Sequence, residues 1–393
     1  MKKAYLMSFS FFVNIFALLF SFFVIGALFG AAFSRPFRKK LTALLQQYQF
    51  PLARSVRNPI LAPGTNPWTA EAVMNPAAIV LGNRTHLLYR AIGMDGVSRL
   101  GYASSADGVF FDAQLPYPAY VVQNPRNMPG RARRYSPVLY PSGGSWGGCE
   151  DPRMVAIDGR VFVTYNAFDG WDFIRVAFTS ISEEDFLAKR FSRWSAPRLL
   201  SRTGERHKNW VLFPEKINGK FAILHNLHAE EVDRVRIEYI DDLDTFDADR
   251  NPVKSPDPAA TPARAIAWHH RMRSAGPPPV KTDRGWLVLY HATSEDEGHR
   301  YKLGALLLDL AEPTKVLARA ALPVLAPDEH YENDGKPGIV YACGAVIRDG
   351  TLFVYYGGAD KVVCVATAPL GAFLDALIEG GKLPLESRSA QTA

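Results

Sequence analysis

One pattern recurs five times along the chain and constrains the fold more than any other feature. A turn that contains Gly leads into a short apolar strand, a polar loop and a second short strand, at spacings of roughly 60 to 75 residues. The turns hold dipeptides such as Asn218-Gly219 and Asp349-Gly350, which tolerate the positive φ angles of tight hairpins. The expected first strands are Thr85 to Arg90, Val161 to Tyr165, Phe221 to His225, Trp286 to His291 and Leu352 to Tyr356, and their partners are Ser98 to Ser104, Ile174 to Thr179, Arg236 to Ile240, Tyr301 to Leu308 and Val362 to Thr367.

Repeated antiparallel units without long helices between them are typical of a β-propeller. We therefore predict an all-β fold, a five-bladed β-propeller over residues 58–377, followed by a flexible tail over residues 378–393. The inner strands of a propeller converge on a central channel. Polar residues at the ends of these strands and in the connecting loops should therefore share one funnel.

The N-terminal part, residues 1–57, differs in composition from the rest. No charged residue occurs from Ala4 to Ser34, and Phe9 to Phe33 is longer than the roughly 20 apolar residues that span a bilayer. The pattern predicts an uncleaved transmembrane helix with a juxtamembrane segment. A secretory signal peptide is the alternative, although its apolar core would be about twice the usual length. Basic residues are slightly more numerous after the apolar run than before it, which favours a cytoplasmic domain over a periplasmic or secreted one.

The overall charge and the cysteines exclude several classes of partner. The formal net charge is +6 and the basic residues are scattered, apart from one cluster directly after the apolar run, so no nucleic-acid partner is expected. The three cysteines lie far apart and show no metal-ligand spacing. We therefore expect neither a disulfide framework nor a bound metal. The sequence leaves a homo-oligomer possible.

A short acidic motif, Gly148 to Arg153, provides the first candidate for chemistry. Asp151 precedes Pro152, which disfavours the helical region and predicts an extended or turn conformation for the acid. In an extended chain Arg153 would lie on the same face as Asp151. A positioned carboxyl group beside a fixed cation fits acid catalysis on an anionic partner. A structural Asp-Pro turn with an ion pair remains the alternative.

Further polar residues fall at the funnel ends of the predicted units. Taken singly, a histidine at a strand end is more often a hydrogen-bonded core residue, and a lysine is usually solvated. Their recurrence at comparable positions of the five units is what makes them candidates. They are Arg90, Asp151 with Arg153, Lys208 with Lys216, His225, Arg271, Tyr290 with His291, and Asp360.

Several longer stretches resemble the signature motifs of glycoside hydrolase family 130. The stretches are Asn75 to Ala78, Leu87 to Ala91, Gly148 to Arg153, Leu212 to Lys220, Ala275 to Pro279, Leu303 to Leu310 and Cys343 to Ala345. The resemblance implies a five-bladed propeller and an activity as a β-mannoside phosphorylase or β-mannosidase. It also implies that Asp151 is the catalytic acid.

The resemblance also suggests roles for the other candidates. Phosphate would be bound by Arg90, Arg153, Lys208, His225, Arg271 and His291, and the sugar by Asn75, Glu150, Lys216, Tyr290 and Asp360. One departure is Asn226, where the family commonly has Arg. Inorganic phosphate would be a co-substrate, and no other cofactor is implied.

Three functions remain open at this point. In an inverting phosphorylase, phosphate is the nucleophile, so one acid plus a basic cradle suffices and the products are α-mannose 1-phosphate and the released sugar. An inverting β-mannosidase needs a second carboxylate to activate water, for example Glu238 or Glu332. A carbohydrate-binding propeller without turnover would lack the acid, whereas Asp151 is present.

Overall fold

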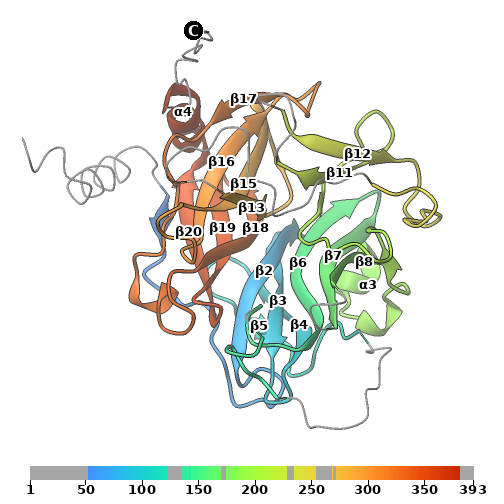
Figure 1. Ribbon diagram of the computed structural model, residues 1–393, viewed down its shortest axis with the longest axis vertical. Coiled ribbons are helices and arrows are strands. Elements are labelled where there is room, and N and C mark those ends of the chain that lie inside the picture. The colour runs from blue at the N-terminus through green and yellow to red at the C-terminus, as the bar shows by residue number, and fades with distance from the viewer. Residues whose placement is uncertain are drawn as a thin grey trace, which may run out of the picture. The chain divides into compact units, whose positions relative to one another are not determined.

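A computed structural model describes residues 52–122, 134–140, 142–169, 174–227, 234–253, 268 and 271–380, and the side chains of residues 226, 271–273 and 380 lie outside the description. All these residues belong to the compact unit that begins at Phe50. The regular secondary structure of the described residues is almost entirely β-strand (Figure 1). This confirms the all-β class.

The largest sheet combines two antiparallel units. One unit consists of β2 (Ala72–Leu81), β3 (Arg84–Ile92), β4 (Val97–Ser105) and β5 (Ala113–Gln114), and the next of β6 (Gly147–Ile157), β7 (Arg160–Asp169), β8 (Ile174–Ser182) and β9 (Arg198–Leu199). A short parallel pairing of Val97 and Ser98 with Gly147 and Gly148 joins them. The two units therefore form one continuous sheet.

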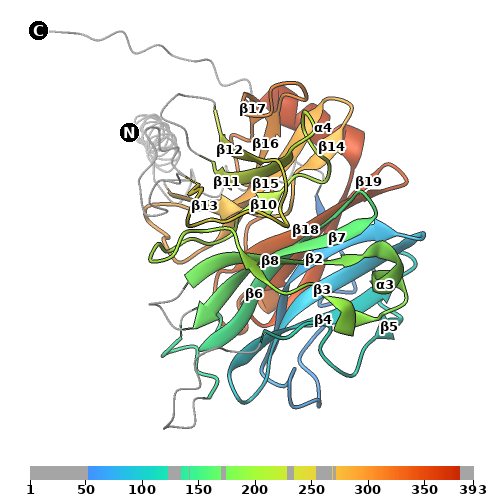
Figure 2. The same ribbon diagram turned by 90° about the vertical axis from the view of Figure 1, so that its right-hand side faces the viewer.

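Three further sheets complete the described fold. They contain β10 (Val211–Leu212), β11 (Phe221–Asn226) and β12 (Arg236–Ile240); then β13 (Arg271–Ala275), β14 (Val280–Thr282), β15 (Gly285–Thr293), β16 (Lys302–Leu308) and β17 (Val316–Arg319); and finally β18 (Val340–Arg348), β19 (Thr351–Gly358), β20 (Val362–Pro369) and β1 (Ala53–Arg54). The described helices are α3 (Glu183–Leu187), α4 (Leu370–Gly380), and the 3₁₀ helices η1 (Phe191–Arg193) and η2 (His330–Glu332). The described strands thus form five antiparallel units, with the first strands β2, β6 and β18 side by side near the middle of the molecule (Figures 1 and 2).

The expected strand pairs correspond to β3 with β4, β7 with β8, β11 with β12, β15 with β16, and β19 with β20. The turns before them take positive φ angles, for example 62° at Asn83 and 49° at Asp158. Each unit also has a strand on the N-terminal side of this turn, and these inner strands were not assigned from the sequence. Asp151 lies on one of them, β6.

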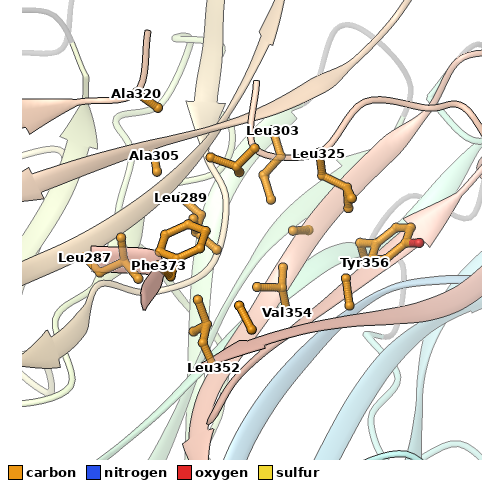
Figure 3. Packing of buried hydrophobic residues seen from close by; sticks show 14 of the residues in the cluster. Leu287, Leu289, Leu303, Ala305, Ala320, Leu325, Leu352, Val354, Tyr356 and Phe373 are labelled. Atoms are coloured by element: carbon orange, nitrogen blue, oxygen red, sulfur yellow. The ribbon is translucent and has the colours of Figure 1, made fainter. Parts of the chain in front are cut away.

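Apolar side chains fill the space between neighbouring sheets. Figure 3 shows one such cluster, in which Leu287, Leu289 and Leu303 from β15 and β16 pack against Leu352 and Val354 of β19. Phe373 of α4 closes this cluster, and all six side chains are at most 1 % exposed. Burial of this apolar surface is what holds adjacent units in fixed positions.

The N-terminal edge of the fold lies upstream of the expected boundary at residue 58. Strand β1 pairs antiparallel with β20, with Ala53 opposite Thr367. Arg54 of this strand forms an ion pair with the fully buried Glu332, 2.7 Å between Nε and Oε1. A chain that starts at residue 55 would therefore lack part of the last sheet. At the other end α4 continues to Gly380, beyond residue 377.

The predicted fold, a propeller with a transmembrane helix, needs a correction. Within the described ranges no helix is long and apolar enough to cross a bilayer. The longest of them, α4, has 11 residues, about half of what a span requires. The predicted span from Ala4 to Ser34 lies outside the described residues. The fold described here is all-β and contains no membrane-spanning helix.

Candidate active site

The inner strands carry irregularities at matching places, and these bring the candidate residues together. The register of β2 shifts between Met74 and Ala77, and that of β6 shifts between Glu150 and Arg153. Each irregularity contains an X-Pro pair, and the residue before proline, Asn75 or Asp151, has a φ of 49°. Bulges re-aim side chains that a regular strand would direct elsewhere. Both side chains are buried, and Asn75 Nδ2 donates to Asp151 Oδ1 over 2.7 Å.

The backbone of Asp151 takes one of the two conformations expected for it. An extended or turn conformation was expected because a proline follows, and the observed φ lies in the left-handed region that turns use, so the extended alternative is wrong. Asp is among the residues that tolerate this region best. As a consequence Arg153 does not share a regular strand face with the acid. Its Nη1 donates instead to the Asp151 carbonyl oxygen, 2.7 Å away.

Arg153 connects several parts of the site. Besides the Asp151 carbonyl, its Nη1 reaches Asn209 Oδ1 at 2.7 Å and its Nε reaches the Gly276 carbonyl at 3.2 Å. The residue is 2 % exposed, and its buried Nη2 has no hydrogen-bond partner in the described ranges. Arg153 thus links β6 to the loops before β10 and after β13, and most of its donors are already used.

Arg90, near the end of β3, is the second buried guanidinium. Its Nη1 donates to Asp151 Oδ1 at 3.2 Å and its Nη2 to Glu150 Oε1 at 2.8 Å. Nε donates to Ser98 Oγ at 2.8 Å, and Nη2 also contacts the Ser142 carbonyl and Ser145 Oγ. Because protein acceptors surround this side chain, Arg90 holds the two acids in place and has little capacity left for a ligand.

Glu150 is fully buried and accepts four hydrogen bonds. Oε1 accepts from Arg90 and Ser145, and Oε2 accepts from Ser142 Oγ at 3.0 Å and Lys208 Nζ at 2.9 Å. Lys208 also donates to Ser142 Oγ at 2.9 Å, and its side chain is 25 % exposed. Lys208 is therefore the most accessible of the three cations around the acids.

Burial and charge act in opposite directions on Asp151. Burial alone would raise the pKa of this carboxyl, but Arg90, Arg153 and Lys208, with the hydrogen bond from Asn75, hold it below the usual value for aspartate. The free protein at neutral pH therefore carries an ionised Asp151. Among the described residues its Oδ2 has only a long contact, 3.5 Å to Asn166 Nδ2.

His291 lies on the β13–β15 side of the cluster. It is fully buried, its Nδ1 is 3.2 Å from Ser274 Oγ, and its Nε2 has no side-chain partner among the described residues. Its ring stacks on Tyr341 with 3.9 Å between centroids and 11° between planes. Burial, with the nearby Arg153, lowers the pKa of His291 to about 3. The ring is therefore neutral at physiological pH.

Asp360 occupies the turn between β19 and β20. Its φ is 53°, and its carboxylate is 3.5 Å from Lys336 Nζ. Burial raises the pKa of Asp360, the charges of Lys336 and Arg90 oppose this effect, and the charge of Asp151 adds to it. Asp360 thus interacts electrostatically with the same cluster.

Three of the expected residues lie elsewhere. Lys216 pairs with Asp158 at 2.8 Å, at the β6–β7 turn. Tyr290 is fully buried and stacks on Trp268 within an apolar cluster. His225 lies beside Trp210, with 5.7 Å between ring centroids, and burial lowers its pKa to about 4. No described contact links these three to Asp151, and the side chain of Arg271 lies outside the description.

Two asparagines that the sequence analysis did not select complete the network. Asn166 Nδ2 donates to Asn209 Oδ1 at 2.9 Å, and Asn166 Oδ1 accepts from the Asn209 backbone at 2.8 Å. Asn166 pairs with Glu150 in the register of its unit, as Arg90 pairs with Met74 in the unit before. Alignment of the two units on their X-Pro pairs would therefore have identified Asn166.

Comparison with known proteins assigns this arrangement to a family. The family model described as beta-1,4-mannooligosaccharide phosphorylase matches residues 47–379. The chain belongs to glycoside hydrolase family 130. This match confirms the family that the motifs resembled, and with it a five-bladed, propeller-like fold for the described units.

Two curated relatives of family 130 resemble the chain over most of its length. A 1,2-beta-oligomannan phosphorylase of Thermoanaerobacter sp. (strain X514) is 36% identical over 80% of this chain and 96% of its own. A beta-1,2-mannobiose phosphorylase of the same strain is 32% identical over 81% of this chain and 97% of its own. The solved beta-1,2-mannobiose phosphorylase of Listeria innocua, in complex with β-1,2-mannobiose, has a TM-score of 0.61 and 22% identity over 83% of this chain and 99% of its own. The last similarity concerns the fold alone.

Proposed function

We propose that this family 130 enzyme catalyses the inverting phosphorolysis of β-mannosides, releasing α-mannose 1-phosphate. The observation that carries the proposal is one acid, Asp151, buried among Arg90, Arg153 and Lys208. Phosphate supplies the nucleophile in such a reaction, so the protein must provide an acid and a positively charged environment. Phosphorylases among the curated relatives support the same reaction.

In this mechanism Asp151 provides the proton for the leaving oxygen, through the sugar's own hydroxyl where the distance requires it. Lys208 offers phosphate the most accessible positive charge, while Arg153 acts through its charge from a buried position. Arg90 and Glu150 position Asp151 and Lys208 through their shared hydrogen bonds. We propose that His291, Asn75 and Asp360 help to hold the sugar or the phosphate, because they lie in this cluster.

Hydrolysis is less well supported because the carboxylates named for it lie elsewhere. Glu332 is fully buried and bound by Arg54 and Tyr356. Glu238 lies on β12, opposite Ile223. Glu150 has four donors and is not free to activate water. Among the described residues Asp360 is the remaining carboxylate in the cluster, and it is the described candidate for activating water.

We further propose that the substrates are β-1,2-linked oligomannosides. The two curated relatives that match this chain over nearly their whole length are named for that linkage. The test incubates the protein with β-1,2-mannobiose, β-1,4-mannobiose and 4-O-β-mannosyl-glucose, each with and without inorganic phosphate. The proposal predicts mannose 1-phosphate only when phosphate is present, and fastest from the β-1,2-linked disaccharide. Free mannose formed without phosphate would show hydrolysis, and no product from any disaccharide would contradict the proposed activity.

A phosphorylase consumes inorganic phosphate and returns a sugar phosphate to metabolism. We therefore propose that the catalytic unit works in the cytoplasm. A reporter fused after Ala393 should then be active in the cytoplasm alone, and periplasmic reporter activity would contradict this location.

A further inference from the structure

The charges around Asp151 are close to balance in the absence of a ligand. Arg90, Arg153 and Lys208 carry three positive charges against the two negative charges of Glu150 and Asp151. Asp360 is paired with Lys336. A dianion that enters this cluster would reverse its net sign. A reversal of this kind disfavours the ionised form of any carboxyl group nearby.

The two carboxylate oxygens of Asp151 differ in their contacts. Oδ1 accepts a 2.7 Å bond from Asn75 and a 3.2 Å bond from Arg90. Within the part of the chain that the structure describes, Oδ2 has only the 3.5 Å contact with Asn166, which is longer than an ordinary hydrogen bond. Oδ2 is therefore the oxygen that has room for a proton. A proton on Oδ2 would leave both bonds to Oδ1 intact.

We propose that phosphate binding and protonation of Asp151 are linked, so that the entering dianion draws a proton from solvent onto Oδ2. This inference rests on the proposed phosphorolysis and adds a second role for phosphate. Phosphate is then both the nucleophile and the ligand that loads the acid. Without it Asp151 stays ionised and the glycosidic bond is protected from cleavage.

Each reaction cycle takes one proton from solvent and returns one proton to solvent. One solvent proton adds to Oδ2 when HPO₄²⁻ binds, and this proton passes to the glycosidic oxygen as its bond to the sugar breaks. The new bond joins a phosphate oxygen to the sugar carbon, and the phosphate proton returns to solvent as the sugar phosphate ionises. Asp151 ends the cycle ionised, as it began.

Other groups that face Asp151 could take up the proton instead. The charged and titratable side chains described around it are Arg90 from β3, Glu150 and Arg153 from β6, Lys208 before β10, His291 from β15, Tyr341 and Cys343 from β18, and Asp360 after β19. The cations already carry their protons, and Glu150 is held by four donors. Asp360 and His291 are therefore the competitors that an experiment must separate from Asp151.

The test is calorimetric titration of inorganic phosphate into the wild type and Asp151→Asn, in buffers of different ionisation enthalpy between pH 5.5 and 8. The ionisation of phosphate itself contributes equally to both titrations. The difference in proton uptake between the wild type and Asp151→Asn therefore reports the protonation of Asp151. We expect the wild type to take up about one proton more per bound phosphate. The affinity of the wild type for phosphate should also fall as pH rises, by about tenfold per pH unit more than that of Asp151→Asn. This holds over the pH range in which Asp151 is ionised in the free protein and protonated in the phosphate complex.

Controls identify the group that is protonated. Asp158→Asn changes an aspartate at the β6–β7 turn and should behave as wild type. Asp360→Asn should keep the extra proton uptake.

A second measurement uses the wild type alone and covers the case that Asp151→Asn does not fold. Infrared difference spectra should show a protonated carboxyl band when phosphate is added. Equal proton uptake by wild type and Asp151→Asn, uptake abolished by Asp360→Asn alone, or no carboxyl band would overturn the inference while leaving phosphorolysis intact. Failure of phosphate to bind would instead contradict the proposed function.

Discussion

Asn75 and Asp151 hold the same place in successive units of the fold and are joined by a 2.7 Å hydrogen bond. Each lies in a register shift of an inner strand, precedes a proline and has a φ of 49°. One unit therefore supplies an amide donor and the next unit supplies the acid that accepts from it. The position of the acid is set by the packing of β2 against β6, and the sequence around Asp151 alone does not determine it.

This relationship predicts the effect of Asn75→Asp. The change replaces a donor with a second carboxyl group, and two carboxylates at this distance cannot both ionise readily, so the pKa of Asp151 should rise. The basic limb of the kcat/KM profile should move to higher pH by a similar amount, because it reports the acid of the free enzyme. Asn83→Asp, in the exposed β2–β3 turn, is the matched control and should leave the profile unchanged.

The same variant makes a prediction about stability. In the wild type the folded pKa of Asp151 is depressed, so its contribution is present above the unfolded pKa and is lost as pH falls through the folded value. In Asn75→Asp the pair shares a proton and the folded pKa is raised. Its stability should therefore fall as pH rises from about 4, the unfolded pKa of aspartate, to neutral. A melting temperature that stays level over this range would contradict the contact between the two side chains.

Arg153→Lys should damage folding as well as activity. A lysine cannot reproduce the bonds to the Gly276 carbonyl, the Asp151 carbonyl and Asn209 together, and unsatisfied buried acceptors remain. We expect a loss of about 3 kcal/mol in the free energy of unfolding. Arg160→Lys is the matched control on the partly exposed pair with Asp244 and should change it by less than about 1 kcal/mol. Denaturant unfolding of both variants gives the comparison, and equal midpoints would refute the linking role of Arg153.

The sequence alone predicted the repeated units, because apolar alternation and Gly-containing turns are local signals. It also selected Asp151, Arg90, Glu150, Arg153 and Lys208, which the structure brings into one network. Arg90, Glu150, Asp151 and Arg153 lie in motifs that are visible in the chain, and Lys208 was selected from its place in its unit.

Other parts could not be read from local signals. Lys216, Tyr290 and His225 sit in comparable positions of their units, yet each contacts neighbours that only the packing of the strands determines. The left-handed φ of Asp151 depends on the irregular pairing of β6 with β7, which proline sterics alone do not reveal. Strand β1 was missed because two residues are too short to give a periodic pattern.

The ion pair between Arg54 and Glu332 should contribute strongly to closing the last sheet. Arg54 donates from Nε and Nη2 to the two carboxylate oxygens, at 2.7 and 3.0 Å, and Glu332 is fully buried. Removal of one partner leaves a buried charge, so Arg54→Met should cost about 3 kcal/mol of unfolding free energy. Arg57→Met, at an exposed position of the same segment, should cost less than about 1 kcal/mol. Similar losses in the two variants, measured by denaturant unfolding, would show that β1 does not stabilise the fold.

The most direct test of the account is the rate of phosphate-dependent mannose 1-phosphate release by Asp151→Asn, measured at a temperature where its melting curve shows a folded protein. The asparagine keeps the size of the side chain but has no proton to transfer. We expect the rate to fall by about 10² to 10⁴ relative to wild type. A folded Asp151→Asn protein that releases mannose 1-phosphate at a near wild-type rate would contradict the assignment of Asp151 as the catalytic acid.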